Sequence, residues 1–228
     1  LRNNATDPTS GEGGGGALHI GSDRIFIGNP DDTFVTNSVF LQNGAENEGA
    51  AIRTASGNTV VTNCTFHSNG NTALFVTTSG EPVVENSIFW NNNREIFNEG
   101  RPRAAINNSV VEGGYPGGTN IIDVDPMIQD PTGDARLSPG SPAIDAGSNS
   151  ALPSDVTDLD NDGDTSEELP LDLAGNVRQQ DVSGVPPDGS FVVDMGAYEA
   201  IGNPLPVELT AFTAQTSGEA VVLNWQTA

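Results

Sequence analysis

The chain of 228 residues contains no lysine, because all eight of its basic residues are arginines, whereas 31 residues are acidic. Its formal net charge at pH 7 is -23. Binding to the phosphates of DNA or RNA requires clustered positive charge, so this balance excludes nucleic acids as partners. The same argument excludes an anionic membrane surface. The charge balance favours divalent cations as partners and solubility in salt-rich surroundings.

The sequence is also poor in cysteine and has no long apolar run. The single cysteine, Cys64, excludes a disulfide framework within the chain. No segment reads as a transmembrane helix or a signal peptide, and we expect no direct insertion into a membrane. Helical periodicity is missing as well, because turn-forming residues interrupt the chain throughout, so we expect no long helices.

A four-residue motif recurs at a nearly fixed spacing, and its copies begin 26, 23 and 22 residues apart. The copies are Asn37-Ser38-Val39-Phe40, Asn63-Cys64-Thr65-Phe66, Asn86-Ser87-Ile88-Phe89 and Asn108-Ser109-Val110-Val111. A period in this range is typical of a solenoid, in which short strands return in register and stack coil on coil. The sequence therefore predicts an all-β fold whose first part is a parallel β-helix.

Stacked coils place like side chains above one another, about 4.8 Å apart, which is the ordinary spacing of paired strands. We therefore expect Phe40, Phe66 and Phe89 to form an aromatic stack inside the helix. Side-chain amides that bond from coil to coil are expected in the column of leading asparagines. That column consists of Asn37, Asn63, Asn86 and Asn108. Cys64 falls in a column of serines and is interpreted as a small packed residue, because a reactive thiol would require a positive charge nearby.

Composition divides the chain into three parts. The predicted parts are the coils in residues 1–118, an acidic loop-rich extension in residues 119–203, and residues 204–228. The first part begins in what reads as mid-coil, so we expect further coils before Leu1. Residues 119–200 hold 17 of the 31 acidic residues and only two basic ones, Arg136 and Arg178. Apolar residues recur there too often for a disordered tail, so we expect this extension to pack on the end or side of the helix.

A short acidic segment reads as a metal-binding loop. Carboxylates alternate from Asp158 to Asp164 around Gly163, which matches the first half of a calcium loop. Leu169 occupies the position where such loops have a bidentate acid, so Glu167 or Glu168 is expected to replace it. The predicted calcium ligands are Asp158, Asp160, Asp162, Asp164 and Glu168. The alternative interpretation is a solvated acidic turn.

A second, looser acidic group is interpreted as surface turns, with a calcium site as the less favoured alternative. It consists of Asp123, Asp125, Asp130 and Asp134. Trp90 and Tyr115 are the candidates in or near the coils for stacking against a sugar ring.

An enzymatic interpretation finds few supporting residues. A glycoside hydrolase needs two facing carboxylates, but among 31 acidic residues some pair will always satisfy this requirement on paper. The clustered bases Arg94, Arg101 and Arg103 are expected to form ion pairs on the surface. Their expected partners are Glu95, Glu99 and Glu112. His19 and His67 lie in different columns of the repeat and are interpreted as strand residues.

Several motifs resemble those of bacterial surface proteins. Gly-Gly-Ala-Leu at 15–18 and the repeated Phe-x-x-Asn resemble chlamydial polymorphic outer membrane proteins. Three ordered motifs, at 123–126, 137–147 and 194–199, are similar to signatures of the choice-of-anchor Q family. This resemblance implies a right-handed, pectin-lyase-like β-helix that is displayed or secreted through varied anchors. It covers roughly residues 15–200.

Residues 205–228 are similar to a module of Bacteroidetes surface proteins that usually precedes a signal for type IX secretion. Apolar residues alternate at Val207, Leu209 and Ala211, and again at Val221, Leu223 and Trp225. This alternation independently predicts two strands that begin a β-sandwich. The resemblance implies that secretion machinery is a partner and that the protein is located outside the cell or at the bacterial cell surface.

The leading functional hypothesis is a non-enzymatic, calcium-stabilised surface protein that acts as an adhesin or as a structural part of an extracellular fibre. Its partners would be glycans or other surface proteins, and its open coil ends would allow head-to-tail self-association. The alternative is a polysaccharide lyase, a hydrolase or a glycan-binding module that uses the groove of the helix. A third hypothesis is a passive secreted fragment carried by its export machinery. Fold analogy alone does not decide among them.

Overall fold

The computed structural model describes residues 4–5, 17–20, 33–45, 49–55, 59–101, 103–130, 132–155, 157–187, 191–201, 209–217 and 220–227. Predictions that involve Leu1 or Val207 lie outside the described residues.

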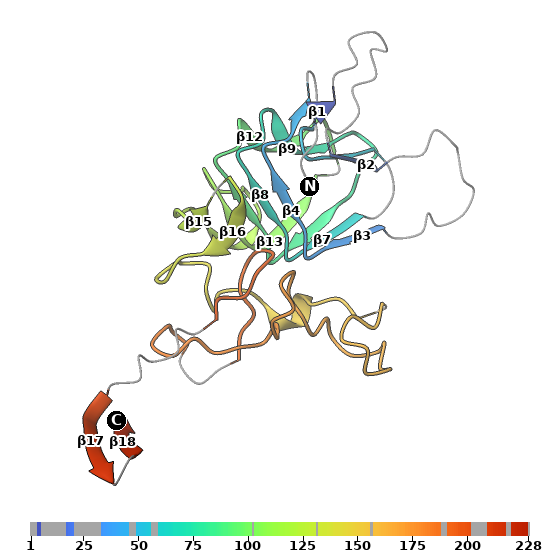
Figure 1. The fold of residues 1–228 in the computed structure, drawn as a ribbon. Coiled ribbons are helices and arrows are strands. Elements are labelled where there is room, and N and C mark those ends of the chain that lie inside the picture. Colours follow the sequence, from blue (N-terminus) through green and yellow to red (C-terminus); the bar gives the residue numbers. More distant parts are fainter. Residues whose placement is uncertain are drawn as a thin grey trace.

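Three parallel sheets run along the first half of the chain and enclose its main core (Figure 1). The first sheet consists of β2 (Leu18–Ile20), β6 (Ile52–Thr54), β9 (Thr72–Val76) and β12 (Arg94–Asn98). The second consists of β3 (Thr33–Thr36), β7 (Thr59–Thr62), β10 (Val83–Glu85) and the first part of β13 (Ala105–Val111). The third consists of β4 (Val39–Leu41), β8 (Thr65–His67), β11 (Ile88–Trp90), the second part of β13 and β14 (Thr119–Ile122). The predicted parallel β-helix is confirmed.

The remaining strands pair outside these sheets. Parallel bridges join β1 (Asn4–Ala5) to β5 (Gly44–Ala45). An antiparallel hairpin joins β15 (Ile128–Asp130) to β16 (Asp134–Leu137), and a short 3-10 turn covers Asn149–Ala151. The two strands predicted near the C-terminus form an antiparallel pair, β17 (Leu209–Ser217) and β18 (Ala220–Thr227).

The aromatic stack inside the column forms as predicted. The ring centroids of Phe40 and Phe66 are 4.7 Å apart, and those of Phe66 and Phe89 are 4.4 Å apart. The rings are nearly parallel, at interplanar angles of 3° and 6°. All three side chains are fully buried. The register of β4, β8 and β11 sets this spacing, because it pairs each phenylalanine with the next.

Cys64 is buried one position after the motif asparagine, as expected for a small packed residue. Its thiol lies 3.4 Å from the carbonyl oxygens of Val35 and Thr62. Burial raises the pKa of this thiol to about 12, so it stays protonated and unreactive. The Cys64 amide donates to Ser87 Oγ, and the Ser87 amide donates to Ser109 Oγ, so the serine column itself bonds from coil to coil.

The predicted asparagine ladder is wrong, because the leading asparagines do not bond to one another along the column. Each adopts a left-handed backbone conformation, with φ between 45° and 52°, and so makes the bend between the second and third sheets. The side chains of Asn37, Asn63 and Asn86 point to the extension instead of to the next coil. Asn108 Nδ2 donates to Glu85, and Asn108 Oδ1 accepts from Asn120.

The ladder forms in the column of asparagines that end each Phe-x-x-Asn. Asn43 Nδ2 donates to Asn69 Oδ1 at 2.9 Å, and Asn69 Nδ2 donates to Asn92 Oδ1 at 2.7 Å. The same oxygens accept the backbone N–H of the preceding rung at 3.0 and 2.9 Å. At the last rung, Asn92 donates its backbone N–H and its side-chain amide to the two carboxylate oxygens of Glu95. Glu95 therefore terminates the ladder.

The extension docks on the leading asparagines of three successive coils. Asn37 Nδ2 donates to the carbonyl of Leu171 at 2.8 Å, and Asn63 Nδ2 donates to that of Asp194 at 3.3 Å. Asn86 exchanges two hydrogen bonds with the backbone of Ser148, at 3.0 and 2.8 Å. These contacts fix the extension along the side of the column.

A second apolar core lies between the outer face of the third sheet and the extension. Its buried members are Ile88, Val110, Leu137, Ala143, Ile144 and Met195. Gly196 approaches the column closely, because a Cβ atom there would lie 2.8 Å from Ile88 and 2.9 Å from Thr65. The Gly196 φ of 105° also favours glycine at this position.

Replacing Asn69 by alanine is expected to lower the free energy of unfolding by about 3 kcal/mol. The change removes the acceptor of both the backbone N–H and the side-chain amide of the buried Asn43, and each buried group that loses its partner costs about 1 to 3 kcal/mol. Urea denaturation of the full chain measures the loss. The exposed Thr78, which follows β9, provides a control, because Thr78→Ala should change stability by less than about 0.5 kcal/mol. Equal effects of both substitutions would contradict the ladder's role.

Candidate functional site

A buried ion pair lies at the centre of the docked extension. Arg178 Nη1 is 2.7 Å from Glu199 Oε1, and the side chains of both residues are 1% exposed. The guanidinium also donates to the carbonyl oxygens of Gly196 and Ala197, at 3.2 and 3.1 Å, and to Asn37 Oδ1 on the column. Arg178 therefore joins the extension to the first of the three docking asparagines.

Asp194 connects this ion pair to another segment of the extension. Its carboxylate accepts the backbone N–H groups of Asp145 at 2.7 Å and Ala200 at 2.6 Å. Its own backbone N–H donates to the carboxylate of Glu199. Asp145 in turn accepts the backbone N–H of Val182 at 3.2 Å. The predicted motifs at 137–147 and 194–199 thus meet in one buried network.

The pKa of Asp194 is raised to about 7, mainly by burial and also by the charge of Asp145, against the lowering effect of the hydrogen bonds from Asp145 and Ala200. Burial also raises the pKa of Glu199 well above its usual value, assisted by Asp194, while Arg178 opposes the rise. A single arginine does not compensate this many enclosed carboxylates. The network is therefore a structural element that holds protons near neutral pH. Sequence reasoning missed Arg178, although the scarcity of bases in the extension was a signal.

The acidic loop brings together three of its five predicted ligands. Carboxylate oxygens of Asp158, Asp160 and Asp162 lie within 4.8 Å of one another. The loop is closed by its own hydrogen bonds, from the N–H of Gly163 to Asp158 at 3.1 Å and from the N–H of Asp162 to Asp160 at 3.3 Å. Such a cluster of hard oxygen atoms has the chemistry that calcium prefers.

The other two predicted ligands point elsewhere. Asp164 accepts the backbone N–H and the hydroxyl of Ser166, which lowers its pKa. Glu168 accepts from the side chain of Gln179 at 2.8 Å. Glu167, the other acid considered for the missing position, lies near the cluster instead.

Glu167 belongs to a second group of carboxylates, with Asp155 and Asp160. Glu167 Oε1 is buried without a hydrogen-bond partner, and its pKa is raised by desolvation and then by the charges of Asp162 and Asp160. Asp155 is 1% exposed and accepts the N–H of Leu159 at 2.6 Å. Sequence reasoning missed Asp155 because it precedes the alternating pattern.

The looser acidic group forms surface turns and hairpin contacts. Asp123 accepts the N–H of Gly113, Asp125 accepts that of Met127, and Asp130 accepts that of Thr132. Asp134 pairs with Arg136 at 2.7 Å. Among the described residues, these four acids do not gather around a common point.

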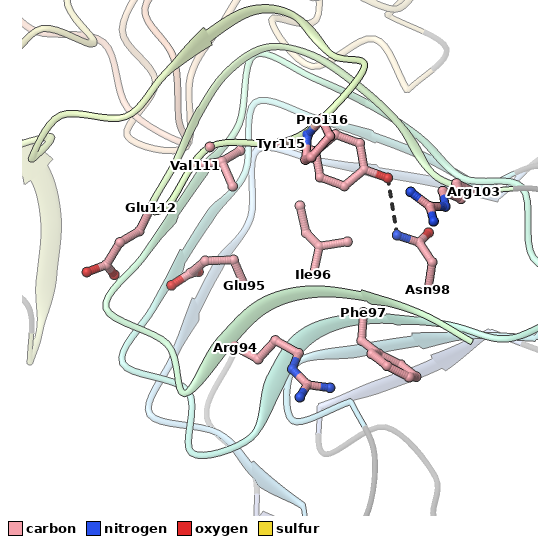
Figure 2. Close-up of a pocket in the computed structure, with 11 residues that line it drawn as sticks. Arg94, Glu95, Ile96, Phe97, Asn98, Arg103, Val111, Glu112, Tyr115 and Pro116 are labelled. Atoms are coloured by element: carbon pink, nitrogen blue, oxygen red, sulfur yellow. Dashed lines mark hydrogen bonds between the residues drawn. The ribbon is translucent and has the colours of Figure 1, made fainter. Parts of the chain in front are cut away.

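A pocket of about 420 Å³ lies at the end of the column, between β12 and the segment at 111–116 (Figure 2). Two carboxylates, Glu95 and Glu112, line one side of it, and Arg94 and Arg103 also contribute. The predicted aromatic candidate Tyr115 lies across the pocket (Figure 2). Its hydroxyl donates to the carbonyl of Ala104 at 2.8 Å and accepts from Asn98 at 3.2 Å.

The ion pairs expected for the three clustered arginines are not formed. Among the described residues, no salt bridge joins Arg94, Arg101 or Arg103 to Glu95, Glu99 or Glu112. Arg94 lies over the ring of Phe97, with its guanidinium carbon 4.9 Å from the ring centroid. Glu95 is instead engaged by the ladder, because both of its carboxylate oxygens accept hydrogen bonds from Asn92.

The pKa of Glu95 is raised to about 7, mainly by burial and also by the charge of Glu112, against the lowering effect of its hydrogen bonds from Asn92. A carboxyl that titrates near neutral pH beside a second carboxyl has the electrostatics of an acid–base pair. Glu112 accepts the backbone N–H of Asn91 at 2.6 Å.

A smaller pocket, of about 270 Å³, lies where the third sheet meets the start of the β15–β16 hairpin. It is lined by His67, Trp90, Asn91, Asp125, Met127 and Ile128. Trp90, the other aromatic candidate, is half-buried and packs on the second core. The two histidines lie in different sheets, His19 in β2 and His67 in β8, as predicted.

Asp194 is expected to make the protein less stable as pH rises. Its folded pKa of about 7 exceeds the ordinary value of 3.8, so the folded chain retains a proton that the unfolded chain has released. Its stabilising contribution is fully present below pH 3.8 and is lost as pH rises through about 7. One pKa unit corresponds to about 1.4 kcal/mol, so the loss should amount to a few kcal/mol.

Urea denaturation at about pH 5 and about pH 8 measures the part of this loss that occurs as pH rises through about 7. Asp194→Asn should weaken the pH dependence, whereas Glu81→Gln, at an exposed position, should leave it unchanged. A dependence that is the same in wild type and in Asp194→Asn would show that Asp194 does not hold the proton.

Comparison with known proteins supports the architecture. Residues 14–126 match a family model described as "Right handed beta helix region". Neither a curated protein nor a solved structure matches the chain. Within the described residues, no helix has the length and apolar character needed to cross a membrane. The stacked parallel sheets and the matched region together identify a right-handed β-helix protein.

Proposed function

We propose that the chain is part of a secreted, non-enzymatic cell-surface protein, an adhesin or a structural component of an extracellular fibre, stabilised by calcium. A stacked column with a buried aromatic stack and an asparagine ladder provides a rigid support. The extension braces this support by bonding to three successive coils. The net charge of -23 suits a protein that binds divalent cations.

The resemblance to choice-of-anchor Q proteins and to Bacteroidetes modules supports the surface location and secretion machinery, including the type IX route, as a partner. Two of the motifs that carry the resemblance, at 137–147 and 194–199, meet through Asp145 and Asp194. Head-to-tail self-association is a further part of the proposal. Among the described strands, β12 pairs only with β9 and is therefore an edge strand, the kind of strand to which another chain can add.

The observation that carries the non-enzymatic interpretation is the engagement of Glu95. Both of its oxygens accept hydrogen bonds from Asn92, so the carboxyl that lines the pocket also completes the ladder. Arg94 is held over Phe97. These side chains of the larger pocket therefore have structural partners that explain their positions.

Calcium is proposed to bind in the acidic loop, through Asp158, Asp160 and Asp162 or through Asp155, Asp160 and Glu167. Both groups share Asp160, which makes it the decisive residue. Bringing these carboxylates so close together is unfavourable without a cation between them.

Calcium at a hundredfold excess over its dissociation constant is expected to stabilise the chain by about 2.7 kcal/mol, which raises Tm by roughly 5 to 10 °C. A thermal melt with calcium and with chelator measures the shift. Asp160→Asn should abolish it, and Asp134→Asn, in the hairpin, should retain it. A wild-type Tm that does not change with chelator would exclude the calcium proposal.

A polysaccharide lyase or hydrolase is the second candidate function. It is favoured by the pocket at the end of the column, where Glu95, with a pKa of about 7, lies beside Glu112.

Incubation with polygalacturonate or alginate, with and without calcium, decides between the two functions. We expect no release of reducing ends or unsaturated products, because Glu95 is committed to the ladder. Product formation by wild type that is abolished in Glu112→Gln, while Glu81→Gln stays active, would establish the enzyme and overturn the non-enzymatic proposal.

A further inference from the structure

The smaller pocket combines parts of the column and of the extension. His67 and Trp90 are register neighbours on β8 and β11, and both side chains line it. Asp125 and Met127 approach from the segment that leads into β15. One part of Trp90 packs against the second core, which fixes the indole in place, and another part faces the pocket. The aromatic surface is therefore held in position before any ligand binds.

His67 is buried, at 6% exposure, and only one of its ring nitrogens has a hydrogen-bond partner among the described residues. Nδ1 lies 2.7 Å from Ser68 Oγ, whereas Nε2 makes no hydrogen bond with the described residues. Ser68 Oγ also accepts from the side-chain amide of Asn91 at 3.1 Å. Because Ser68 Oγ already accepts from Asn91, its hydroxyl proton is free to be donated to Nδ1 of His67. That arrangement leaves a proton on Nε2, which makes it a donor.

The imidazole stays neutral at physiological pH. Burial lowers the pKa of His67, while the facing carboxylates Asp125 and Glu112 oppose this effect. A neutral ring donates a hydrogen bond without presenting a charge to the ligand.

Asp125 supplies the complementary acceptor. Its Oδ1 accepts the N–H of Met127 at 2.8 Å, and its second oxygen makes no hydrogen bond with the described residues. Met127 has a positive φ of 54°, which is uncommon for a residue with a long side chain. This conformation aims the turn so that both Asp125 and Met127 line the pocket.

We propose that this pocket, the Trp90 pocket, binds one ring of a neutral polysaccharide, with Trp90 against the ring face, His67 Nε2 donating to a hydroxyl and Asp125 accepting from one. An aromatic surface, a neutral donor and an acceptor match the alternating faces and hydroxyls of a sugar. Among the described residues, no arginine lines the pocket, and the carboxylate of Asp125 repels anions, so uronic acids and phosphates are disfavoured. The volume of about 270 Å³ suits a single ring.

This inference rests on the proposed role as an adhesin and names the class of its ligand. The test uses the full chain with Trp225→Phe, which leaves Trp90 as the sole tryptophan and hence as the fluorescent reporter. Titrations are made with cellotetraose, xylotetraose and mannotetraose, with tetragalacturonate as the acidic probe and hexylamine as the cationic one. A saturable change in Trp90 emission is expected with at least one neutral oligosaccharide and with neither charged probe.

Calorimetry with the oligosaccharide that binds then measures the variants. Trp90→Ala, His67→Phe and Asp125→Asn should each weaken binding by at least about tenfold. Phe34→Ala, which removes an exposed aromatic side chain from the second sheet, should bind as wild type. If Trp90→Ala fails to fold, the other two variants, which keep the pocket filled, decide the matter.

The proposal is overturned if no neutral oligosaccharide binds, if hexylamine alone binds, or if the variants bind as tightly as wild type. Failure of the pocket and failure of the proposed function give different results. If calcium stabilises the chain but no sugar binds, only the proposal that the Trp90 pocket binds a sugar is rejected. If a sugar binds and is then cleaved, as detected by mass spectrometry of the oligosaccharide, the sugar-binding proposal is supported and the non-enzymatic function is rejected.

Discussion

Vertical register is the constraint on which this structure depends. Each coil lies one strand spacing above the last, so each inward side chain must pack against the equivalent side chain of the next coil. Phenylalanine satisfies this requirement by parallel stacking, asparagine by donating to one rung and accepting from the next, and serine by accepting an amide. Carboxylates do not satisfy it, because like charges would face each other at short range. Among the described residues, the fully buried acids accordingly all lie in the extension, and none of them lies inside the column.

Sequence reasoning predicted the period, the fold and the phenylalanine stack because these depend only on spacing. It chose the wrong column for the asparagine ladder for a physical reason. Asn37 and Asn43 begin series with the same period, so periodicity alone does not separate them. The difference is the left-handed backbone at Asn37 and its equivalents, which turns those side chains toward the extension. The backbone geometry at the bend therefore decides which asparagines form the ladder and which bind the extension.

The candidate sites show a similar division. Alternation of acids in one short loop was enough to place Asp158, Asp160 and Asp162 together. Contributions from distant segments were not predictable, since nothing local marks Asp155 as a neighbour of Asp160 or Arg178 as the partner of Glu199. The Trp90 pocket likewise exists only because the segment before β15 folds back on the column. Each of these missed residues is brought into place by tertiary packing.

The docking of the extension on three successive coils has a mechanical consequence. Asn37, Asn63 and Asn86 lie on neighbouring turns, and each holds a different stretch of the extension. A tensile load applied along the long axis must shear these three anchors together, whereas a load that peels one end meets them in sequence. The extension thus reinforces the column, and we expect the force needed to stretch the protein along its axis to exceed the force needed to peel the coils apart from one end.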